Sequence, residues 1–220
     1  MKSITVLLPA FNEEKAIGRV IQDIKALKLG YEILVVNNKS TNGTKAEAIA
    51  LGAKVLYEGK KGKGNAVRVG FKHIKTPFVV MIDSDFTYPA KHLPEIIRSL
   101  DNGADVVIGY RNKRAKGSIS HMNIIGNWGL SMLASILYGV YVRDVCSGMW
   151  GFKRDALSSY KLTSNGFTLE ADLFVNTIKG KHKLVQIPIE YRARLDGSVA
   201  KLGIKDGFKI GWFLIKGRFR

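Results

Sequence analysis

Two aspartates separated by a single residue are the feature of this sequence that most directly suggests chemistry. Asp83 and Asp85 flank Ser84 and follow the apolar run Phe78–Ile82. Such a run predicts a buried strand, so both carboxylates leave at a strand's end. Residues i and i+2 of an extended segment point the same way, and the pair can therefore converge on one cation. Carboxylate oxygens beside a diphosphate suit Mg²⁺ or Mn²⁺, although Asp also favours ordinary turns.

A second candidate is the glycine-lysine-glycine element at 62–64, which precedes a helical pattern. Two standard phosphate-binding motifs are excluded, because Val67 stands where the dinucleotide fingerprint needs glycine and Asn65 where a P-loop needs lysine. Lys63, with Lys60 and Lys61, can still meet a phosphate at the helix N-terminus. A plain surface turn is the alternative interpretation.

Other reactive side chains are few. No nucleophilic triad is evident, and the four histidines lack metal-ligand spacing. Glu170 and Asp172 could form a pair that acts as a base, or could be surface or cap charges of a helix. Cys146, the one cysteine, excludes an internal disulfide framework, fits a reducing compartment and is expected to be a small buried hydrophobe.

The elements that must position these residues alternate between strands and helices. Strands are predicted at Ile4–Leu8, Glu32–Val36, Lys54–Tyr57, Phe78–Ile82, Val106–Ile108 and Leu184–Ile189, and helices at Glu13–Leu29, Thr44–Leu51, Asn65–Ile74, His92–Leu100 and Leu169–Lys179. This alternation predicts an α/β fold with a mostly parallel sheet and helices on both faces. The chemically unusual segments 9–14, 37–44 and 83–88 all follow strand ends, where ligands bind in such sheets.

The second half of the chain is less regular. Arg111–Lys116 is predicted to be a basic loop, and Phe208–Arg220 a basic amphipathic helix. Met122–Val142 carries no Asp, Glu, Lys or Arg and is long enough to span a bilayer. Its asparagines and serines favour a buried or interfacial helix instead.

The net charge of +17 attracts nucleic acid, anionic membranes or phosphorylated substrates without choosing among them. The length of 220 residues fits one domain. Met1-Lys2-Ser3 runs directly into a predicted strand, so no signal peptide is expected.

Six ordered motifs resemble glycosyltransferase family 2, and most closely its dolichyl- and polyprenyl-phosphate hexosyltransferases, the dolichol-phosphate mannose synthase group. They are LPAFNEE at 8–14, GKGNAVRVGF at 62–71, MIDSDFTYP at 81–89, VIGYR at 107–111, DVCSGMWGFKRDAL at 144–157 and IPIEYRARLDGSVAKL at 187–202. Their order along nearly the whole chain makes the resemblance more specific than any one of them.

The resemblance implies one GT-A catalytic domain over 1–220. Residues 1–110 would bind the nucleotide sugar, 111–204 the acceptor, and 205–220 would form the C-terminal helix. Donor contacts would come from Pro9, Phe11, Glu13, Asn38, Lys63, Asp83 and Ser84, and metal ligands from Asp83 and Asp85. Acceptor phosphate would meet Arg111, Arg114, Arg194, Ser198 and Lys201. The catalytic group would be Asp85, Arg111 and Arg194.

The implied reaction moves a hexose from UDP-glucose, UDP-N-acetylglucosamine or GDP-mannose to dolichyl or polyprenyl phosphate, with inversion and with Mg²⁺ or Mn²⁺. The enzyme would lie on the cytoplasmic face of a membrane as a peripheral protein, without a nucleic-acid partner. A membrane-anchoring subunit or a homo-oligomer would be compatible with it. The alternatives are a soluble or other non-lipid acceptor and, remotely, a basic nucleic-acid-binding module.

One departure leaves the donor open. The family's Asp-Asp-Gly-Ser-x-Asp is replaced by Asn37-Asn38-Lys39-Ser40-Thr41-Asn42. An acid here would accept a hydrogen bond from the base, and Asn38 keeps only a carbonyl acceptor. The choice between uridine and guanosine therefore stays open, while Ser147-Gly148-Met149-Trp150 resembles the glucose and N-acetylglucosamine branches.

Overall fold

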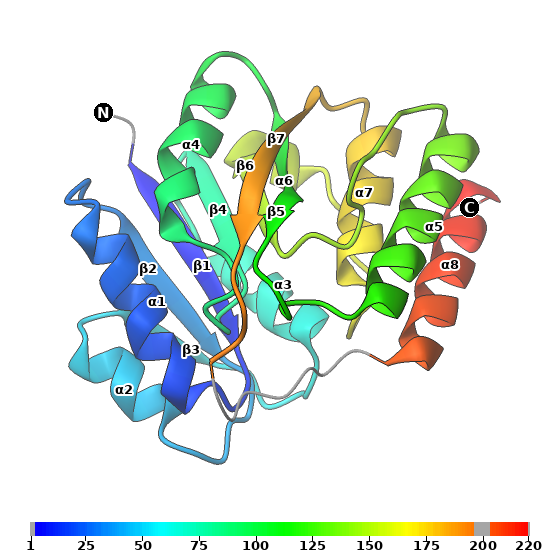
Figure 1. The fold of residues 1–220 in the computed structure, drawn as a ribbon. Coiled ribbons are helices and arrows are strands. Elements are labelled where there is room, and N and C mark those ends of the chain that lie inside the picture. The colour runs from blue at the N-terminus through cyan, green and yellow to red at the C-terminus, as the bar shows by residue number, and fades with distance from the viewer. Residues whose placement is uncertain (1–2, 196–202, 220) are drawn as a thin grey trace.

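The structure is a computed structural model that describes residues 3–195 and 203–219 (Figure 1). Its strands are β1 (Ile4–Ala10), β2 (Glu32–Asn37), β3 (Lys54–Tyr57), β4 (Phe78–Ile82), β5 (Val106–Arg114), β6 (Met149–Lys153) and β7 (Leu184–Tyr191). Its helices are α1 (Glu14–Ala26), α2 (Thr44–Ala50), α3 (Lys63–His73), the 3₁₀ turn η1 (Ala90–His92), α4 (Leu93–Asp101), α5 (His121–Tyr138), α6 (Arg154–Ser158), α7 (Leu169–Lys179) and α8 (Ile204–Phe219).

The strands form one sheet in the order β3-β2-β1-β4-β6-β5-β7. β1, β2, β3 and β4 are parallel to their neighbours, and so are β5 and β7. β6 runs antiparallel to both β4 and β5. The predicted mostly parallel sheet is therefore confirmed, with one reversed strand that joins two parallel groups.

Two apolar layers hold helices on the two faces of the sheet. Alternate residues of one strand point to opposite faces, and in β4 the side chain of Val80 packs with α1 and α4 while Val79 packs with α3 and α7. The same division holds in β1, where Leu8 and Leu7 enter the two different layers. Figure 1 shows α1, α2 and α4 on one side and α3, α7, α5 and α8 on the other.

Gly70 allows α3 to approach the sheet closely. A Cβ at this position would lie 2.4 Å from the Leu7 side chain on β1, so no larger residue fits without a shift. The close approach brings the N-terminus of α3, with Lys63, to the end of the sheet where β1 and β4 finish.

Three elements differ from the sequence prediction. β6 and α6 were not expected, and β5 continues to Arg114, so the prediction of a loop beginning at Arg111 is wrong. Pairing explains the extension, because β5 and β7 remain paired as far as Arg114 and Tyr191, with one register shift between Arg111 and Lys113. Strand neighbours routinely override the weak strand preference of charged residues.

α5 and α8 lie side by side at the right of Figure 1, and α8 packs against α7. α5 begins at the Ser120 cap, whose hydroxyl oxygen accepts from the Asn123 N–H at 3.3 Å, and ends at Gly139 with φ of 66°. α8 buries Ile210 and Leu214 beneath it. Neither helix, nor any other within the described residues, has the length and apolarity needed to span a membrane.

Candidate active site

The carboxyl ends of β1 and β4 open into a cavity of about 1800 Å³. Every candidate residue within the described ranges lines it: Pro9, Phe11, Glu13, Asn38, Lys63, Asp83, Ser84, Asp85, Arg111, Arg114 and Arg194. Ser198 and Lys201 lie outside the described residues. Topology explains the gathering, because parallel strands deliver their following loops to one edge.

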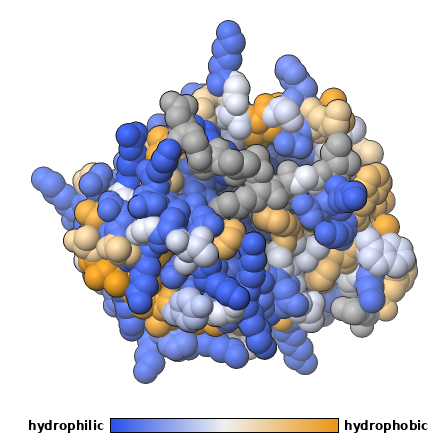
Figure 2. Space-filling model, turned by 90° about the horizontal axis from the view of Figure 1, so that it is seen from below, coloured by the Kyte–Doolittle hydropathy of each residue, from blue (hydrophilic) through white to orange (hydrophobic). Residues whose placement is uncertain are grey.

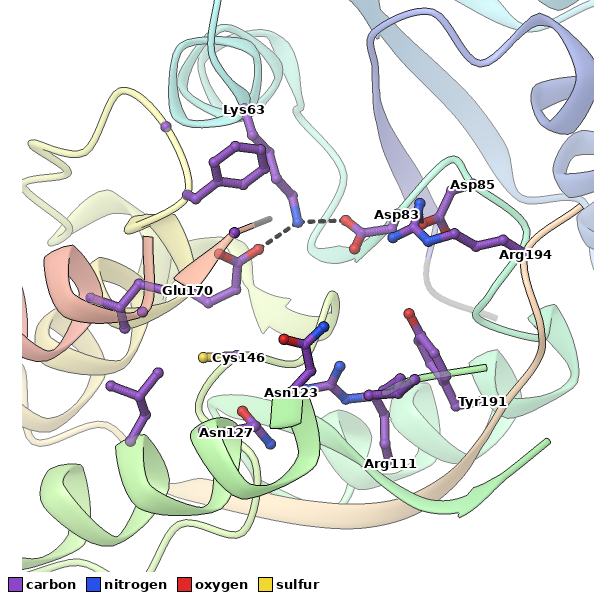
Figure 3. Close-up of a pocket in the computed structure, with 18 of the residues that line it drawn as sticks. Lys63, Asp83, Asp85, Arg111, Asn123, Asn127, Cys146, Glu170, Tyr191 and Arg194 are labelled. Atoms are coloured by element: carbon purple, nitrogen blue, oxygen red, sulfur yellow. Dashed lines mark hydrogen bonds and ion pairs between the residues drawn. The ribbon is translucent and has the colours of Figure 1, made fainter. Parts of the chain in front are cut away.

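Lys63 joins Asp83 to Glu170 across this cavity (Figure 3). Its Nζ lies 2.5 Å from Asp83 Oδ1 and also donates to Glu170 Oε1 at the start of α7. Burial alone would lower the pKa of Lys63, but the two carboxylates overcome this and raise it. Lys63 is therefore a fixed positive charge. Its contacts with Asp83 and Glu170 connect the loop at 83–88 to α3 and α7.

Asp83 has an altered acidity. Burial raises its pKa to about 6, although the neighbouring Lys63 ammonium opposes the rise. Asp85 and Glu170 add negative charge nearby and raise it further. The carboxyl of Asp83 consequently changes charge close to neutral pH.

Asp85 is almost fully buried and has both carboxylate oxygens engaged. Oδ1 accepts from the Thr87 N–H at 3.2 Å and from its hydroxyl at 2.5 Å, while Oδ2 lies 2.7 Å from Arg194 Nη1. Ser84 and Asp85 lie in a turn, and Phe86 after them has a φ of 68°, so Asp83 and Asp85 do not belong to one extended segment. The expectation that strand geometry orients them is wrong, yet both carboxylates still line the same cavity (Figure 3).

The donor set fits a hard divalent cation that is shared with a substrate. Asp83 and Asp85 offer oxygen ligands, and no cluster of three or more His, Cys, Asp or Glu that could hold a metal exists among the residues the structure describes. Mg²⁺ and Mn²⁺ characteristically keep waters and take one or two carboxylates plus phosphate oxygens. Two aspartates that line one open cavity match this pattern.

Arg111 is held by a buried carboxylate. Its Nε and Nη2 donate to the two oxygens of Asp144 at 2.6 and 2.7 Å, and Asn127 Nδ2 donates to the same group at 2.9 Å. Burial favours the neutral form of Asp144, but Arg111 prevails and lowers its pKa. Arg111 thus faces the cavity in a fixed orientation, while Arg114 on the same strand is exposed at its rim.

The amide loop after β2 has a structural role. Asn38 donates to the carbonyls of Glu58 and Lys60 at 3.3 and 2.8 Å, and its Oδ1 accepts from the Gly62 N–H at 2.6 Å. Asn38 therefore clamps the loop that leads into α3. Asn38 also lines the cavity, and an amide oxygen has a second lone pair besides the one that Gly62 occupies.

The loop after β1 meets this amide loop. Asn12 Oδ1 accepts from the Thr41 N–H at 2.9 Å. Ser84 donates its hydroxyl to the Pro9 carbonyl at 2.8 Å, which joins the ends of β1 and β4. Lys61 Nζ stands 4.4 Å from the centre of the Phe11 ring and places a cation at this side of the cavity. Aromatic and cationic groups of this kind suit a nucleotide.

Sequence reasoning missed two anchoring carboxylates. Asp144 opens one of the six motifs, but its pairing with Arg111 has no local signal, because the two lie 33 residues apart. The contact of Glu170 with Lys63 has none either, because these residues lie 107 apart. Glu170 and Asp172 are both buried, so they are not surface charges. Asp172 accepts from the Thr163 and Ser164 N–H groups at 2.6 and 2.7 Å and holds a loop.

Cys146 also differs from its expectation. It is half-buried and lines the cavity, and burial raises the pKa of its thiol. A thiol of this acidity is a poor nucleophile at neutral pH.

Known proteins supply an independent comparison. Residues 5–161 match the model of the glycosyl transferase family 2. The chain is 34% identical to the glycosyltransferase AglJ of Haloferax volcanii over 93% of this chain and 68% of that protein. It is 32% identical to the dolichyl-phosphate hexose transferase of the same organism, over 87% of this chain and 83% of that protein.

Solved structures show the same fold. Glucosyl-3-phosphoglycerate synthase from Mycobacterium tuberculosis, crystallised with UDP, superposes with a TM-score of 0.77 at 22% identity, over 99% of this chain and 79% of that one. A further structure of that enzyme holds Mn²⁺, UDP and glucosyl-3-phosphoglycerate and gives a TM-score of 0.76 at 24% identity, over 98% of this chain and 78% of that one. The sheet and its helices are thus those of the GT-A fold. Because the family model covers well over half of the chain, and relatives about a third identical cover most of it, the chain belongs to glycosyltransferase family 2.

Proposed function

We propose that this glycosyltransferase moves a hexose from a nucleotide-diphosphate sugar to a polyprenyl or dolichyl phosphate, with inversion at the anomeric carbon and at the surface of a membrane. The observation that carries the proposal is the shape of the cavity. Its ionic end, with Asp83, Asp85 and Arg111, continues without interruption between α5 and α8, where Leu130, Leu133 and Ile215 line it.

The ionic end supports donor binding. The loops that follow β1 and β2 offer Phe11, Glu13 and Asn38 to a nucleoside, and Asp83 and Asp85 would hold a divalent ion against its diphosphate. The bound ion would stabilise the negative charge that grows on the departing nucleoside diphosphate. Lys63 would add a fixed positive charge on the same side.

The acceptor side is rich in arginine. Arg111, Arg114 and Arg194 line the cavity, and a guanidinium pairs with phosphate through two parallel N–H donors. A phosphate monoester is ionised near neutral pH and attacks the anomeric carbon without a strong base. Glu170 need not act as a base, since its carboxylate is engaged with Lys63.

The apolar end supports a prenyl chain and a membrane. Nine of the eleven large apolar side chains that are exposed in the described residues lie on or just after α5 or on α8: Met122, Ile125, Trp128, Met132, Ile136, Tyr141, Phe208, Trp212 and Phe219. Figure 2 shows apolar residues at the right-hand side, where these helices lie, beside a surface crowded with hydrophilic groups. Such a pairing of apolar and basic residues suits the interface of an anionic membrane.

A matrix of donors and acceptors tests the proposal. UDP-glucose, UDP-N-acetylglucosamine and GDP-mannose would each be offered with Mn²⁺ or Mg²⁺, to polyprenyl phosphate or to 3-phosphoglycerate. We expect a glycolipid product with at least one donor. A sugar transferred only to the soluble acceptor would contradict the lipid proposal, and would favour the alternative that the name of the fold neighbour suggests.

Asp85→Ala tests the metal site in the same assay. We expect product formation to fall by at least about a hundredfold, because leaving-group stabilisation of this kind is worth several kcal/mol. Circular dichroism and thermal unfolding check that the fold is kept. Asp23→Ala is the matched control, since Asp23 pairs with Arg192 outside the cavity at 2.6 Å.

A further inference from the structure

The contact between Asp85 and Arg194 places a positive charge where a metal ion would bind. Arg194 Nη1 lies 2.7 Å from Asp85 Oδ2, and the other oxygen of Asp85 is engaged by Thr87. A divalent cation at Oδ2 would compete with this guanidinium for the lone pairs of the oxygen, and the two positive charges would repel each other at short range. Repulsion of this kind favours departure of Arg194 when a metal ion binds.

Arg194 differs from Lys63 in how firmly it is held. Lys63 is fixed between two carboxylates and its side chain is 18% exposed, whereas the side chain of Arg194 is 28% exposed. Arg194 also follows the last residue of β7 by three positions, outside the strand ladder. An ion pair that is partly open to water is weak enough for a divalent ion to displace.

We propose that Arg194 is the counter-ion of Asp85 in the metal-free enzyme and exchanges its place with the incoming metal. The displaced guanidinium remains at the cavity, where it becomes available to the phosphate of the acceptor. Metal and donor then bind first, and the acceptor phosphate second. This order rests on the proposed function, but the exchange of Arg194 for the metal is independent of which acceptor is used.

Binding of Mn²⁺ alone tests the exchange. Free Mn²⁺ is followed by its electron paramagnetic resonance signal during titration of the whole chain. Arg194→Gln should bind Mn²⁺ about two- to fivefold more tightly than wild type, because the competing ion pair is gone. Arg192→Gln is the matched control. It removes the same charge two positions earlier in the chain, where Arg192 pairs with Asp23 outside the cavity. Its Mn²⁺ affinity should equal that of wild type.

The results separate failure of this inference from failure of the proposed function. Equal or weaker Mn²⁺ binding by Arg194→Gln, relative to Arg192→Gln, overturns the exchange even if glycolipid is formed. Asp85→Asn should lose the Mn²⁺ site. If it keeps wild-type affinity, the ion does not bind at Asp85, and both the exchange and the proposed metal site fail. If the variants bind Mn²⁺ as expected but no glycolipid forms with any donor, only the proposed lipid acceptor is contradicted.

A second measurement uses the wild-type protein. Phenylglyoxal modifies accessible guanidinium groups, and mass spectrometry locates the modified residue. We expect Mn²⁺ to speed modification of Arg194 severalfold and to leave Arg192, the internal reference, unchanged. An Arg194 rate that is the same with and without Mn²⁺ would show that the guanidinium stays on Asp85, and would overturn the exchange.

Discussion

Asp83 gives the site a charge that depends on pH. Because burial raises its pKa to about 6, the carboxyl is ionised above that pH and protonated below it. A protonated carboxyl is a poor ligand for a divalent ion. The same raised pKa means that folding is favoured by protonation, so this group contributes more stability below pH 6 than above it. Metal binding and stability therefore respond to acid in opposite directions at this residue.

Mn²⁺ affinity should consequently fall as the pH drops through about 6, approaching a tenfold loss per further pH unit. Titrations between pH 5 and 8 measure this directly. The electron paramagnetic resonance signal of free Mn²⁺ is a suitable readout, since the titration needs neither donor nor acceptor. An affinity that is flat across this range would show that Asp83 stays ionised and that its pKa is not raised.

Asp144 is predicted to be a stability residue. Its side chain is 2% exposed and that of Arg111 is 11% exposed, so Asp144→Asn leaves a buried guanidinium without its charge partner. We expect a loss of about 3 kcal/mol in the free energy of unfolding, measured with urea. Asp23→Asn breaks the partly exposed pair with Arg192 and should lose about 1 kcal/mol or less. Similar losses in the two variants would contradict this account of Asp144.

The lowered pKa of Asp144 also predicts how this stability difference depends on pH. Its pKa is lowered, so its stabilising contribution is complete above the ordinary carboxyl pKa of about 4 and is lost as the pH falls through the folded-state value. The stability difference between wild type and Asp144→Asn should therefore shrink in acid below pH 4. A difference that stays constant there would contradict the lowered pKa.

At the scale of elements, α5 and α8 carry glycines that line the groove between them. A Cβ added at Gly129 or Gly207 meets no atom within 4 Å, so these positions leave open space rather than close contacts. Glycine inside a helix is destabilising by about 1 kcal/mol relative to alanine, so the helices carry it at a disadvantage. The open space is consistent with a groove that holds a prenyl chain.

Gly129→Leu and Gly207→Leu should fill the groove without weakening the fold. We expect kcat/KM for a long polyprenyl phosphate to fall by about tenfold or more. The added leucine would keep the prenyl chain out of the groove, so that more than one of its CH₂ groups would stay in water. A short prenyl phosphate should be used normally by the same variants and is the control. The thermal midpoint should stay equal or rise. Equal losses with both acceptors would place the prenyl chain outside this groove.

Most helices and strands could be predicted from the sequence, but β6 could not. The alternation of apolar runs and helical patterns predicted the parallel strands and the helices that cover them, because each element carries its own period. β6 was missed since Met149–Lys153 is short, contains Gly151 and becomes a strand only by pairing with β4 and β5. A Cβ at Gly151 would lie 2.2 Å from Ile96, which reflects tertiary packing that no local pattern reveals.

Some features of the candidate site could likewise be predicted from the sequence and others could not. Residues at strand ends were predictable, because topology alone carries Asp83 and Pro9 to one edge of the sheet. Their charge partners were not, since Lys63 and Glu170 meet only after α3 and α7 pack on one face. Motifs therefore named the residues that face the cavity, and three-dimensional packing decided which cations and carboxylates pair.

For the whole molecule, the apolar face and the basic surface should act together on a membrane. Trp212→Ser is expected to weaken binding to anionic vesicles by about tenfold, because a large apolar side chain no longer enters the interface. Tyr57→Ser is the control, since Tyr57 is similarly exposed, at 62% against 65% for Trp212, but lies on β3 at the far edge of the sheet. Cosedimentation with vesicles measures both variants.

The charge contribution has its own signature in that experiment. With a net charge of +17, wild-type binding should weaken as salt rises and should be poor on vesicles of neutral lipid. Equal binding by the Trp212 and Tyr57 variants would remove α8 from the contact with lipid.

The reversed strand β6 has a mechanical consequence. It is the only described strand that joins the β1–β4 group to β5 and β7, and hydrogen-bonded ladders bind it on both sides. Asp83 follows β4 while Arg111 is part of β5, so one continuous sheet fixes the spacing between them. Within the described residues, a continuous hydrogen-bonded sheet therefore connects the strand that precedes Asp83 to the strand that contains Arg111. Changes in the outer helices α5 and α8 can therefore reshape the groove between them while the sheet keeps Asp83 and Arg111 at the same spacing.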